Sequence, residues 1–364
     1  MEATKGRIGL LQIFMIFMLM NGLSTHVIIN PMLLEAAGRD AWLSVLMTGV
    51  LYLPWCIMIA LMIRRSEHRK LQPWLAERTS PFVSWLLLAP IYIILFLIGM
   101  ETVEHTTIFV VANYLPQTPQ WVIVVVLILI CVYCASAGIR TIATTAGILL
   151  PIVIILGYFV AFANMPEKDY SLLRPVLENG WLPPIRGTIY VGSGLVELIF
   201  IIGLQHRMKQ SIKIWQVLLF GIFMLYIMLG PIIGGITEFG AAEAAKQQES
   251  PYEQWRLVKI GAVIEHVDFL SEFQWLSGAL IRISLSLYLI VDVFSFRQKQ
   301  SRLLLMSAIA LTLMIPLFIP FNRYSLYKWI MHGYVPITLA VLFGISIILA
   351  CIAFIPKRAN GGIT

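Results

Sequence analysis

The chain has 364 residues, of which 59% are hydrophobic and only 12% are charged, and its mean hydropathy is +0.85. Soluble domains carry charge on about 25% of their residues, so this composition excludes a soluble enzyme, a disordered tail and a secreted disulfide scaffold. The net charge of +7 does not indicate nucleic-acid binding here, because its distribution between the loops matters more than its sign. We therefore expect an integral membrane protein.

Ten stretches are long and apolar enough to cross a bilayer, which takes about 20 helical residues. They cover residues 9–29, 41–63, 82–112, 120–137, 141–164, 187–205, 214–236, 270–294, 303–321 and 333–355. The connections between them are too short to fold as separate domains. We predict one all-α transmembrane domain over residues 1–364, with two halves of five spans each at about 9–164 and 187–355.

The loops on the two sides of these spans differ in basic content. With the N-terminus inside, the inside segments hold 16 lysines and arginines and the outside segments hold 9. Cytoplasmic loops carry the excess of basic residues, so both termini and residues 64–78 and 207–213 are predicted to be cytoplasmic. The acidic loop 237–269 is predicted to be external. Its alanine-rich run at 241–246 predicts a short helix.

Two spans contain helix-weakening residues at corresponding positions of the two halves. The first span carries Asn21, Gly22, Leu23, Ser24 and Thr25, and the sixth carries Gly192, Ser193 and Gly194. Paired interruptions of this kind are typical of transporter binding sites, whereas close helix packing through small residues is the alternative. The matching positions favour a binding cavity. Half-helix ends near Gly22 and Gly194 would suit a zwitterion, with amides for its carboxylate and carbonyls for its ammonium.

Ionisable side chains inside spans cost at least about 2.5 kcal/mol and therefore mark functional candidates. Glu101, Glu104 and His105 share one face of the third span, Glu197 lies in the sixth and Arg282 in the eighth. At 1.5 Å per residue, Arg282 lies at about the depth of both Glu197 and Glu101 and could pair with either. A structural ion pair that fixes helix register and a proton-coupling carboxyl at Glu101 or Glu197 remain as alternatives.

The sequence contains no pattern of a known catalytic or metal site. There is no HExxH helix, P-loop, GxSxG turn or GxGxxG after a strand. Cys131 and Cys134 form a CxxC inside an apolar run, where a buried pair is more typical than redox or metal chemistry. Glu272 and Asp292 lie near opposite ends of the eighth span, where we expect solvated or snorkelling side chains rather than catalytic ones. We expect no enzyme activity, no cofactor and no metal.

One short motif connects the chain to a known family. The run Ala37-Gly38-Arg39-Asp40-Ala41-Trp42 resembles the membrane-spanning B subunits of bacterial spore germinant receptors, the spore germination permeases, which also have ten spans. Supporting matches are Arg140 with Pro151, Trp275 with Arg282-Ile283-Ser284, and Glu197. The family usually has glycine before this glutamate, and this chain has Val196.

The resemblance implies a branch of the amino acid–polyamine–organocation transporters, with a five-plus-five inverted repeat. In that fold the broken first and sixth helices bind the ligand, flanked by the third and eighth. Together with the breaks and charges, this predicts a ligand site at Asn21, Gly22, Leu23, Ser24, Thr25, Glu101, Thr102, Gly192, Ser193, Gly194, Glu197, Ser277 and Ile281. Glu101, Glu197 and Arg282 are the candidates for ion pairing or proton coupling.

The resemblance also implies a function and partners. It implies a subunit that senses a nutrient, with an amino acid favoured, in the spore inner membrane or the bacterial cell membrane. The expected partners are a larger A-type subunit, a lipoprotein C-type subunit and membrane lipid, with no nucleic acid. A secondary amino acid transporter, in one form proton-coupled, is the alternative, because it requires the same cavity.

Overall fold

The computed structural model describes residues 6–247, 249–259, 266–294, 296, 298–319 and 322–355, and the statements below concern these residues. They form helices of three kinds: α-helices, and 3-10 or π segments designated η. The bounds, in chain order, are α1 (Leu10–Leu23), η2 (Ser24–Ile28), α2 (Ile29–Ala37), η3 (Gly38–Asp40), α3 (Ala41–Arg65), α4 (Leu71–Arg78), α5 (Pro81–Asn113), α6 (Gln120–Ala137), α7 (Ile139–Ala163), η4 (Met165–Glu167), η5 (Tyr170–Leu173), α8 (Leu182–Val196), η6 (Glu197–Arg207), α9 (Ile214–Phe239), α10 (Ala241–Ala244), α11 (Ser250–Arg256), α12 (Phe269–Asp292), α13 (Lys299–Thr312), η7 (Ile315–Phe318), α14 (Arg323–Trp329), η8 (Ile330–Tyr334) and α15 (Val335–Phe354).

The predicted all-α membrane class is confirmed. Among the described residues, nine helical runs are long and apolar enough to cross a membrane. The first of them, Leu10–Arg65, covers two of the predicted stretches, 9–29 from its second residue and 41–63 in full, because the short turn η3 joins them without a gap. Each of the ten predicted stretches overlaps a helix. The sixth stretch begins five residues earlier than predicted, at Leu182.

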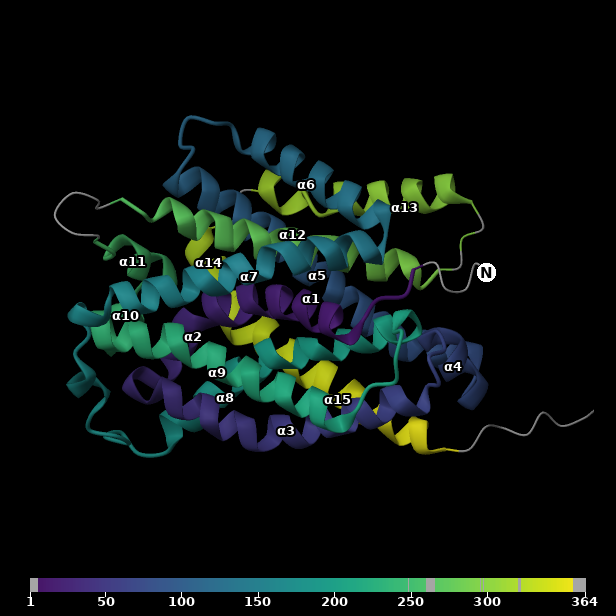
Figure 1. Cartoon of the computed structure of the whole chain (residues 1–364), viewed down its shortest axis with the longest axis horizontal. Helices are drawn as coiled ribbons and strands as arrows, with labels where there is room; N and C mark the ends of the chain where they lie inside the picture. Colours follow the sequence, from purple (N-terminus) through teal and green to yellow (C-terminus); the bar gives the residue numbers. More distant parts are fainter. Residues whose placement is uncertain are drawn as a thin grey trace, which may run out of the picture.

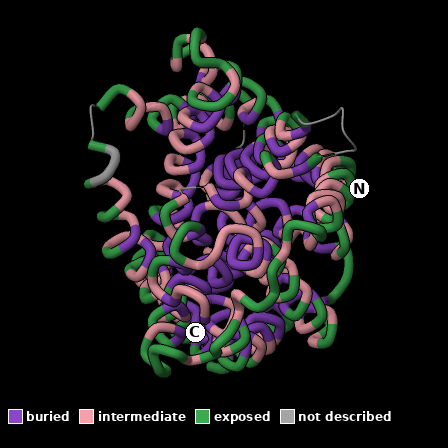
Figure 2. Tube along the Cα trace, turned by 90° about the vertical axis from the view of Figure 1, so that its left-hand side faces the viewer, coloured by how far each residue is buried: buried purple, intermediate pink, exposed green. Residues whose placement is uncertain are grey.

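The helices that carry the mid-membrane charges lie at the centre of the bundle. In the most apolar 18-residue stretch of each span, 78% of the residues are buried in α12 and in the run formed by α8 and η6. The corresponding share is 11% in α7 and 22% in the span that contains α13. Helix α12 packs against α1, α5, α6 and α7, and α8 packs against α2, α3 and α15. Figure 2, a view along the bundle, shows the buried residues in the middle and the exposed ones around them.

The outer surface of the bundle is apolar, as a lipid-facing surface must be. Val50, Tyr133 and Leu304 are each more than 70% exposed, and they belong to three different helices. Apolar side chains exposed on several helices would be an aggregation hazard in water. In a bilayer they face acyl chains of similar polarity, which agrees with the hydropathy of the sequence.

The predicted loops divide between the two ends of the bundle. The first described residues, α4 and the end of α15 lie at one end, and α10 and α11 lie at the other (Figure 1). The loop after η6 is at the first end, because Ile8 exchanges backbone hydrogen bonds with Arg207 and Lys209. This is the relative arrangement predicted, and the cytoplasmic assignment of that end stays a prediction. Residues 1–5, 260–265 and 356–364, which belong to the predicted termini and external loop, lie outside the described residues.

The run at residues 37–42, which carries the resemblance, forms the turn between α2 and α3. Gly38 has φ of +55°, a region that side chains with a Cβ disfavour. The Asp40 carboxylate accepts a hydrogen bond from the Leu177 amide at 3.0 Å, and Arg39 pairs with Glu178 at 2.9 Å. The motif therefore joins the first helical hairpin to the loop that precedes α8.

Candidate ligand site at three irregular helix segments

The first span changes its helix type near its middle. Helix α1 continues without a gap into the π-helix η2, and Thr25 donates a hydrogen bond to the Asn21 carbonyl at 2.8 Å where the pattern changes. Pro31 has no N–H to donate to the carbonyl of Val27, four residues earlier in η2, and this favours a local departure from α geometry. Single π turns often occur at functional sites.

The sixth span also changes helix type, one turn later than predicted. Residues Gly192–Gly194 lie inside α8, and the change to the 3-10 helix η6 begins at Glu197. A Cβ on Gly194 would lie 2.6 Å from Cδ1 of Ile29, and one on Gly192 would lie 3.3 Å from the Leu339 side chain. The prediction of an unwound segment at these glycines is therefore wrong, because both serve close packing.

The tenth span contributes a third irregular segment, which the sequence analysis missed. The π-helix η8 ends at Tyr334, and Pro336 follows, as Pro31 follows η2. Ser193 of α8 donates a hydrogen bond to the Val335 carbonyl at 3.0 Å. The run Gly333-Tyr334-Val335-Pro336 could have indicated this interruption, since glycine and proline so close together weaken a helix.

A buried ion pair lies where the first and sixth spans meet. Nη1 of Arg282 lies 2.5 Å from Oε2 of Glu197, and Nη2 lies 2.7 Å from Oε1. The same guanidinium donates to the Thr102 hydroxyl at 2.9 Å and to the Met20 carbonyl at 3.0 Å. Arg282 is 1% exposed and Glu197 is 3% exposed. Of the two carboxylates considered from sequence, Glu197 forms the pair, and one arginine thereby joins α1, α5, η6 and α12.

Two further hydrogen bonds connect the first span directly to the sixth. Ser24, the first residue of η2, donates to Oε1 of Glu197 at 3.2 Å. The amide of Asn21 donates to the Gly194 carbonyl at 3.4 Å. The π segment and the 3-10 segment therefore meet at the ion pair, although 173 residues separate them in the chain.

The unusual length of η6 has a geometric consequence. It runs for 11 residues, whereas 3-10 runs beyond three or four residues are uncommon. With three residues per turn, Glu197, Gly203 and His206 share one face. That face follows α12: Glu197 pairs with Arg282, a Cβ on Gly203 would lie 3.0 Å from Leu289, and His206 contacts Asp292. At about 2.0 Å per residue this segment extends far enough to stay in register with α12.

The other end of η6 is also tied to α12 by charge. Oδ1 of Asp292 lies 2.8 Å from Nη2 of Arg207, and Oδ2 lies 2.9 Å from Nε2 of His206. Lys70 donates to the Asp292 carbonyl at 2.9 Å. Asp292 is 8% exposed. The expectation of a solvated or snorkelling Asp292 is therefore wrong, because Arg207 and His206 of η6, together with Lys70 just before α4, enclose it.

The remaining predicted site residues divide into two groups. Glu101 is half-buried beside the ion pair, and Gly22 is half-buried, with no heavy atom within 4 Å of the position a Cβ would occupy. The hydroxyl of Ser277 bonds its own helix at the Phe273 carbonyl, and Ile281 is fully buried. Leu23 packs against α12, since a Cβ on Gly278 would lie 3.2 Å from its Cβ. Glu101 and Gly22 thus lie next to the place where η2, η6 and η8 meet, which we call the convergence. The others have packing roles.

Several buried polar atoms near the convergence have no hydrogen-bond partner among the described residues. They are Oδ1 of Asn21, both amide atoms of Asn30 and the hydroxyl of Tyr334. The Tyr334 hydroxyl is within electrostatic reach of Glu101, Glu197 and Arg282. A buried polar atom without a partner is costly, so these atoms are candidates to contact a bound polar ligand.

Aromatic side chains fill the space between this convergence and the α11 end of the bundle. Trp275 stacks on Phe109 at a centroid distance of 3.8 Å and donates to the Thr106 hydroxyl at 3.1 Å. His105 packs edge-on against Trp275 and lies 3.6 Å from the Glu249 carboxylate, just before α11. The loop that carries α11 therefore covers the site from the α11 end of the bundle.

The described residues contain no group of three or more His, Cys, Asp and Glu side chains that could hold a metal ion. Cys131 and Cys134 are free thiols, and both are buried. The CxxC spacing thus corresponds to two packed side chains on α6.

Comparisons with known proteins identify the family. A model of the spore germination protein family, the spore permeases, matches residues 7–325. The chain is 41% identical over 353 residues to spore germination protein XB of Bacillus anthracis, covering 96% of this chain and 99% of that protein. It is 22% identical over 291 residues to spore germination protein KB of Bacillus subtilis, covering 78% of this chain and 77% of that protein. The chain therefore belongs to the spore germination permease family of membrane proteins.

Proposed function

We propose that this chain is the nutrient-binding membrane subunit of a spore germinant receptor, and that its ligand is an amino acid. The ligand would bind where η2, η6 and η8 converge, flanked by α5 and α12. This is the arrangement expected of a transporter-derived site at interrupted helices. The five-plus-five repeat and the kinship with amino acid transporters belong to the same proposal.

One observation carries the proposal. Polar side-chain atoms without hydrogen-bond partners in the described part of the chain surround the Arg282–Glu197 ion pair, and the hydrogen bonds of that pair are already made within the protein. Arg282 donates to Glu197, Thr102 and Met20, so we assign it to holding the helices. The half-buried carboxylate of Glu101 and the unpartnered oxygens of Asn21 and Tyr334 are acceptors suited to a ligand ammonium.

Binding would be signalled through the ends of the irregular segments. A ligand that favours one arrangement of η2 and η6 shifts the equilibrium between arrangements by its difference in affinity. Receptor subunits of the A and C types would read the change from the membrane surface. The location would be the spore inner membrane, with both termini in the cytoplasm.

A thermal-shift screen of the purified protein against amino acids, sugars and nucleosides tests the ligand class. A ligand at 100 times its Kd stabilises the folded state by about 2.7 kcal/mol, so one or a few amino acids should raise the unfolding temperature. Glu101→Gln should lose this shift while keeping the unliganded unfolding temperature, and Ser277→Ala is the matched control that should keep it. A shift with sugars or nucleosides alone would show that the ligand class is wrong.

Uptake measurements separate a receptor from a secondary amino acid transporter, the alternative function. The half-buried Glu101, which has no ion-pair partner among the described residues, is the feature that favours a proton-coupled transporter. We expect no concentration of labelled amino acid by proteoliposomes that contain this chain alone. Accumulation that a pH gradient drives and Glu101→Gln abolishes would favour the transporter.

A further inference from the structure

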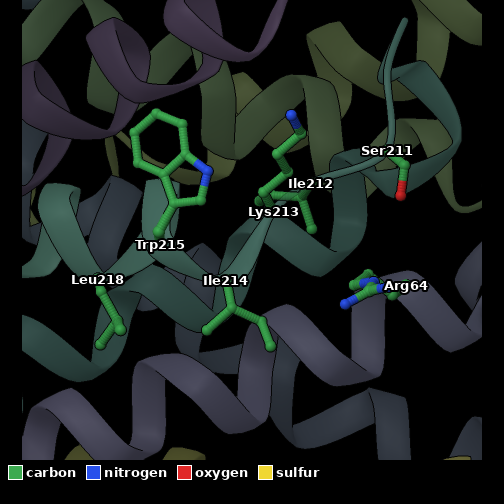
Figure 3. A pocket seen from close by; sticks show the side chains of 7 residues that line it. All are labelled: Arg64, Ser211, Ile212, Lys213, Ile214, Trp215 and Leu218. Atoms are coloured by element: carbon green, nitrogen blue, oxygen red, sulfur yellow. The ribbon is translucent and has the colours of Figure 1, made fainter.

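A pocket outside the proposed nutrient site lies at the α4 end of the bundle. It has a volume of about 570 Å³ and is lined by the end of α3, the loop after η6 and the start of α9. The lining residues are Arg64, Ser211, Ile212, Lys213, Ile214, Trp215 and Leu218. Figure 3 shows Arg64 and Ser211 on one side of the hollow and Trp215 and Leu218 on the other.

The pocket has the charge of an anion site. Arg64 and Lys213 are exposed, and neither forms an ion pair among the described residues. The sequence contains no Asp or Glu between Glu197 and Glu238, so the loop that supplies Lys213 has no acid of its own to neutralise it. Ser211 adds a hydroxyl that can donate a hydrogen bond. A phosphate group matches these donors.

The pocket also continues into an apolar stripe. Trp215, Leu219, Ile222 and Tyr226 are each between 51% and 59% exposed. Their spacing of four, three and four residues places them on one face of α9. That face starts at the end of the span, where tryptophan and tyrosine favour the boundary between headgroups and acyl chains. An occupant with a phosphate at Arg64 and Lys213 therefore has room for a hydrocarbon chain along α9.

We propose that this pocket binds the headgroup of an anionic phospholipid such as phosphatidylglycerol. The phosphate lies between Arg64 and Lys213, and one acyl chain follows Trp215 and Leu219 toward the centre of the bilayer. A free phosphate has no hydrocarbon chain that could contact the apolar face of α9. A zwitterionic lipid would place its own cation beside Arg64 and Lys213. The bound lipid thus connects α3 to the loop that leaves η6.

Quenching of tryptophan fluorescence by brominated lipids tests the site directly. The purified full-length chain in detergent is titrated with brominated phosphatidylglycerol or brominated phosphatidylcholine, and the difference from Trp215→Phe isolates the signal of Trp215. We expect phosphatidylglycerol to quench Trp215 at lower concentration than phosphatidylcholine. Each basic residue near an anionic surface contributes enough to weaken binding about 5-fold when removed. Arg64→Gln and Lys213→Gln together should thus weaken it about 25-fold.

Matched variants and ligands make the outcome decisive. Lys209→Gln removes an exposed charge from the same loop but outside the pocket, and it should leave quenching of Trp215 unchanged. Lys213→Arg, which keeps the charge, should bind normally and shows that the fold is intact. Equal quenching by phosphatidylcholine, or an equal effect of Lys209→Gln, would overturn the proposal. Competition by soluble glycerol phosphate at the concentration at which the lipid binds would assign the pocket to a free phosphoester instead.

Discussion

The two ends of η6 are both joined to α12 by charge, but they lie in different surroundings. At the start, the side chains of Arg282 and Glu197 are 1% and 5% exposed and form a two-point contact. At the other end, the side chain of Arg207 is 26% exposed beside Asp292. The first contact is dry and the second is reached by water. The same kind of pair therefore fixes the helix at one end and can be released at the other.

This difference follows from how solvent acts on charges. A buried pair whose partners are both desolvated resists the removal of either one, because the survivor is left uncompensated. A pair that water reaches loses less when broken, since water and salt replace part of the interaction. We therefore expect any opening of η6 to begin near Arg207 and to leave Glu197 in place.

Breaking the buried pair should have the largest effect of any single substitution in η6. Glu197→Gln and Arg282→Gln should each lower the stability by about 3–5 kcal/mol, because each leaves one buried charge without its partner. The double variant should be less destabilised than the sum of the two, since both charges leave together. Unfolding by SDS titration of the purified protein, with membrane abundance as a second readout, measures all three.

The same cycle with Glu101→Gln is the control. Glu101 adjoins the pair without taking the place of Glu197, so its effect should add to that of Arg282→Gln. Strictly additive effects of Glu197→Gln and Arg282→Gln would contradict the pair. If Glu197→Gln instead lost the nutrient response at normal abundance, and Arg282→Gln restored nothing, Glu197 would act on the ligand or a proton.

The pair at the other end of η6 should be weaker and sensitive to salt. Asp292→Asn removes the charge that faces Arg207 and His206, and a loss of about 2 kcal/mol is expected for charged hydrogen bonds in partial contact with water. Raising NaCl from about 0.05 to about 0.5 M should reduce the difference between Asp292→Asn and the parent protein, because screening acts on accessible charges. A loss as large as that of Glu197→Gln, unaffected by salt, would remove the distinction between the two ends.

Two glycines near the buried ion pair, Gly194 in α8 and Gly22 in α1, test how tightly the start of η6 is held. Gly194→Ala should lower the stability by about 1–3 kcal/mol, because its methyl group would press on Ile29 and Thr25. Gly22→Ala should be neutral or stabilising by up to about 1 kcal/mol, since the position is open and helical. Thermal unfolding of the two variants checks this, and equal destabilisation by both would show that the contact at Gly194 does not restrain η6.

Hydropathy and depth predicted much of this architecture. The stretch 120–137 coincides with α6, and equal depth in the membrane suggested that Arg282 could meet Glu197. Both inferences depend only on helix rise and on the thickness of the bilayer. Such quantities can be taken from the sequence because they need no knowledge of which helices are neighbours.

The sequence was less informative where helices contact one another. Gly194 marked the correct region, but glycine serves packing and unwinding equally well, and only the position of Ile29 decides between them. Asp292 looked solvated because its partners, His206 and Arg207, are 85 or more residues away. The three-residue period of η6 is hidden because residues 198–204 form a continuous non-polar run, in which every face of a helix is hydrophobic.

The smallest effect is expected from the link between η2 and the buried pair. Ser24→Ala removes one hydrogen bond to Glu197, whose carboxylate keeps both contacts to Arg282, so the loss should be about 1 kcal/mol. In the Glu197→Gln background the same substitution should cost less, because the acceptor is no longer charged. SDS unfolding of the four proteins measures this coupling. If Ser24→Ala were as harmful in the Glu197→Gln background as in the parent protein, Ser24 would stabilise η2 alone, and the two irregular segments would not be coupled through Glu197.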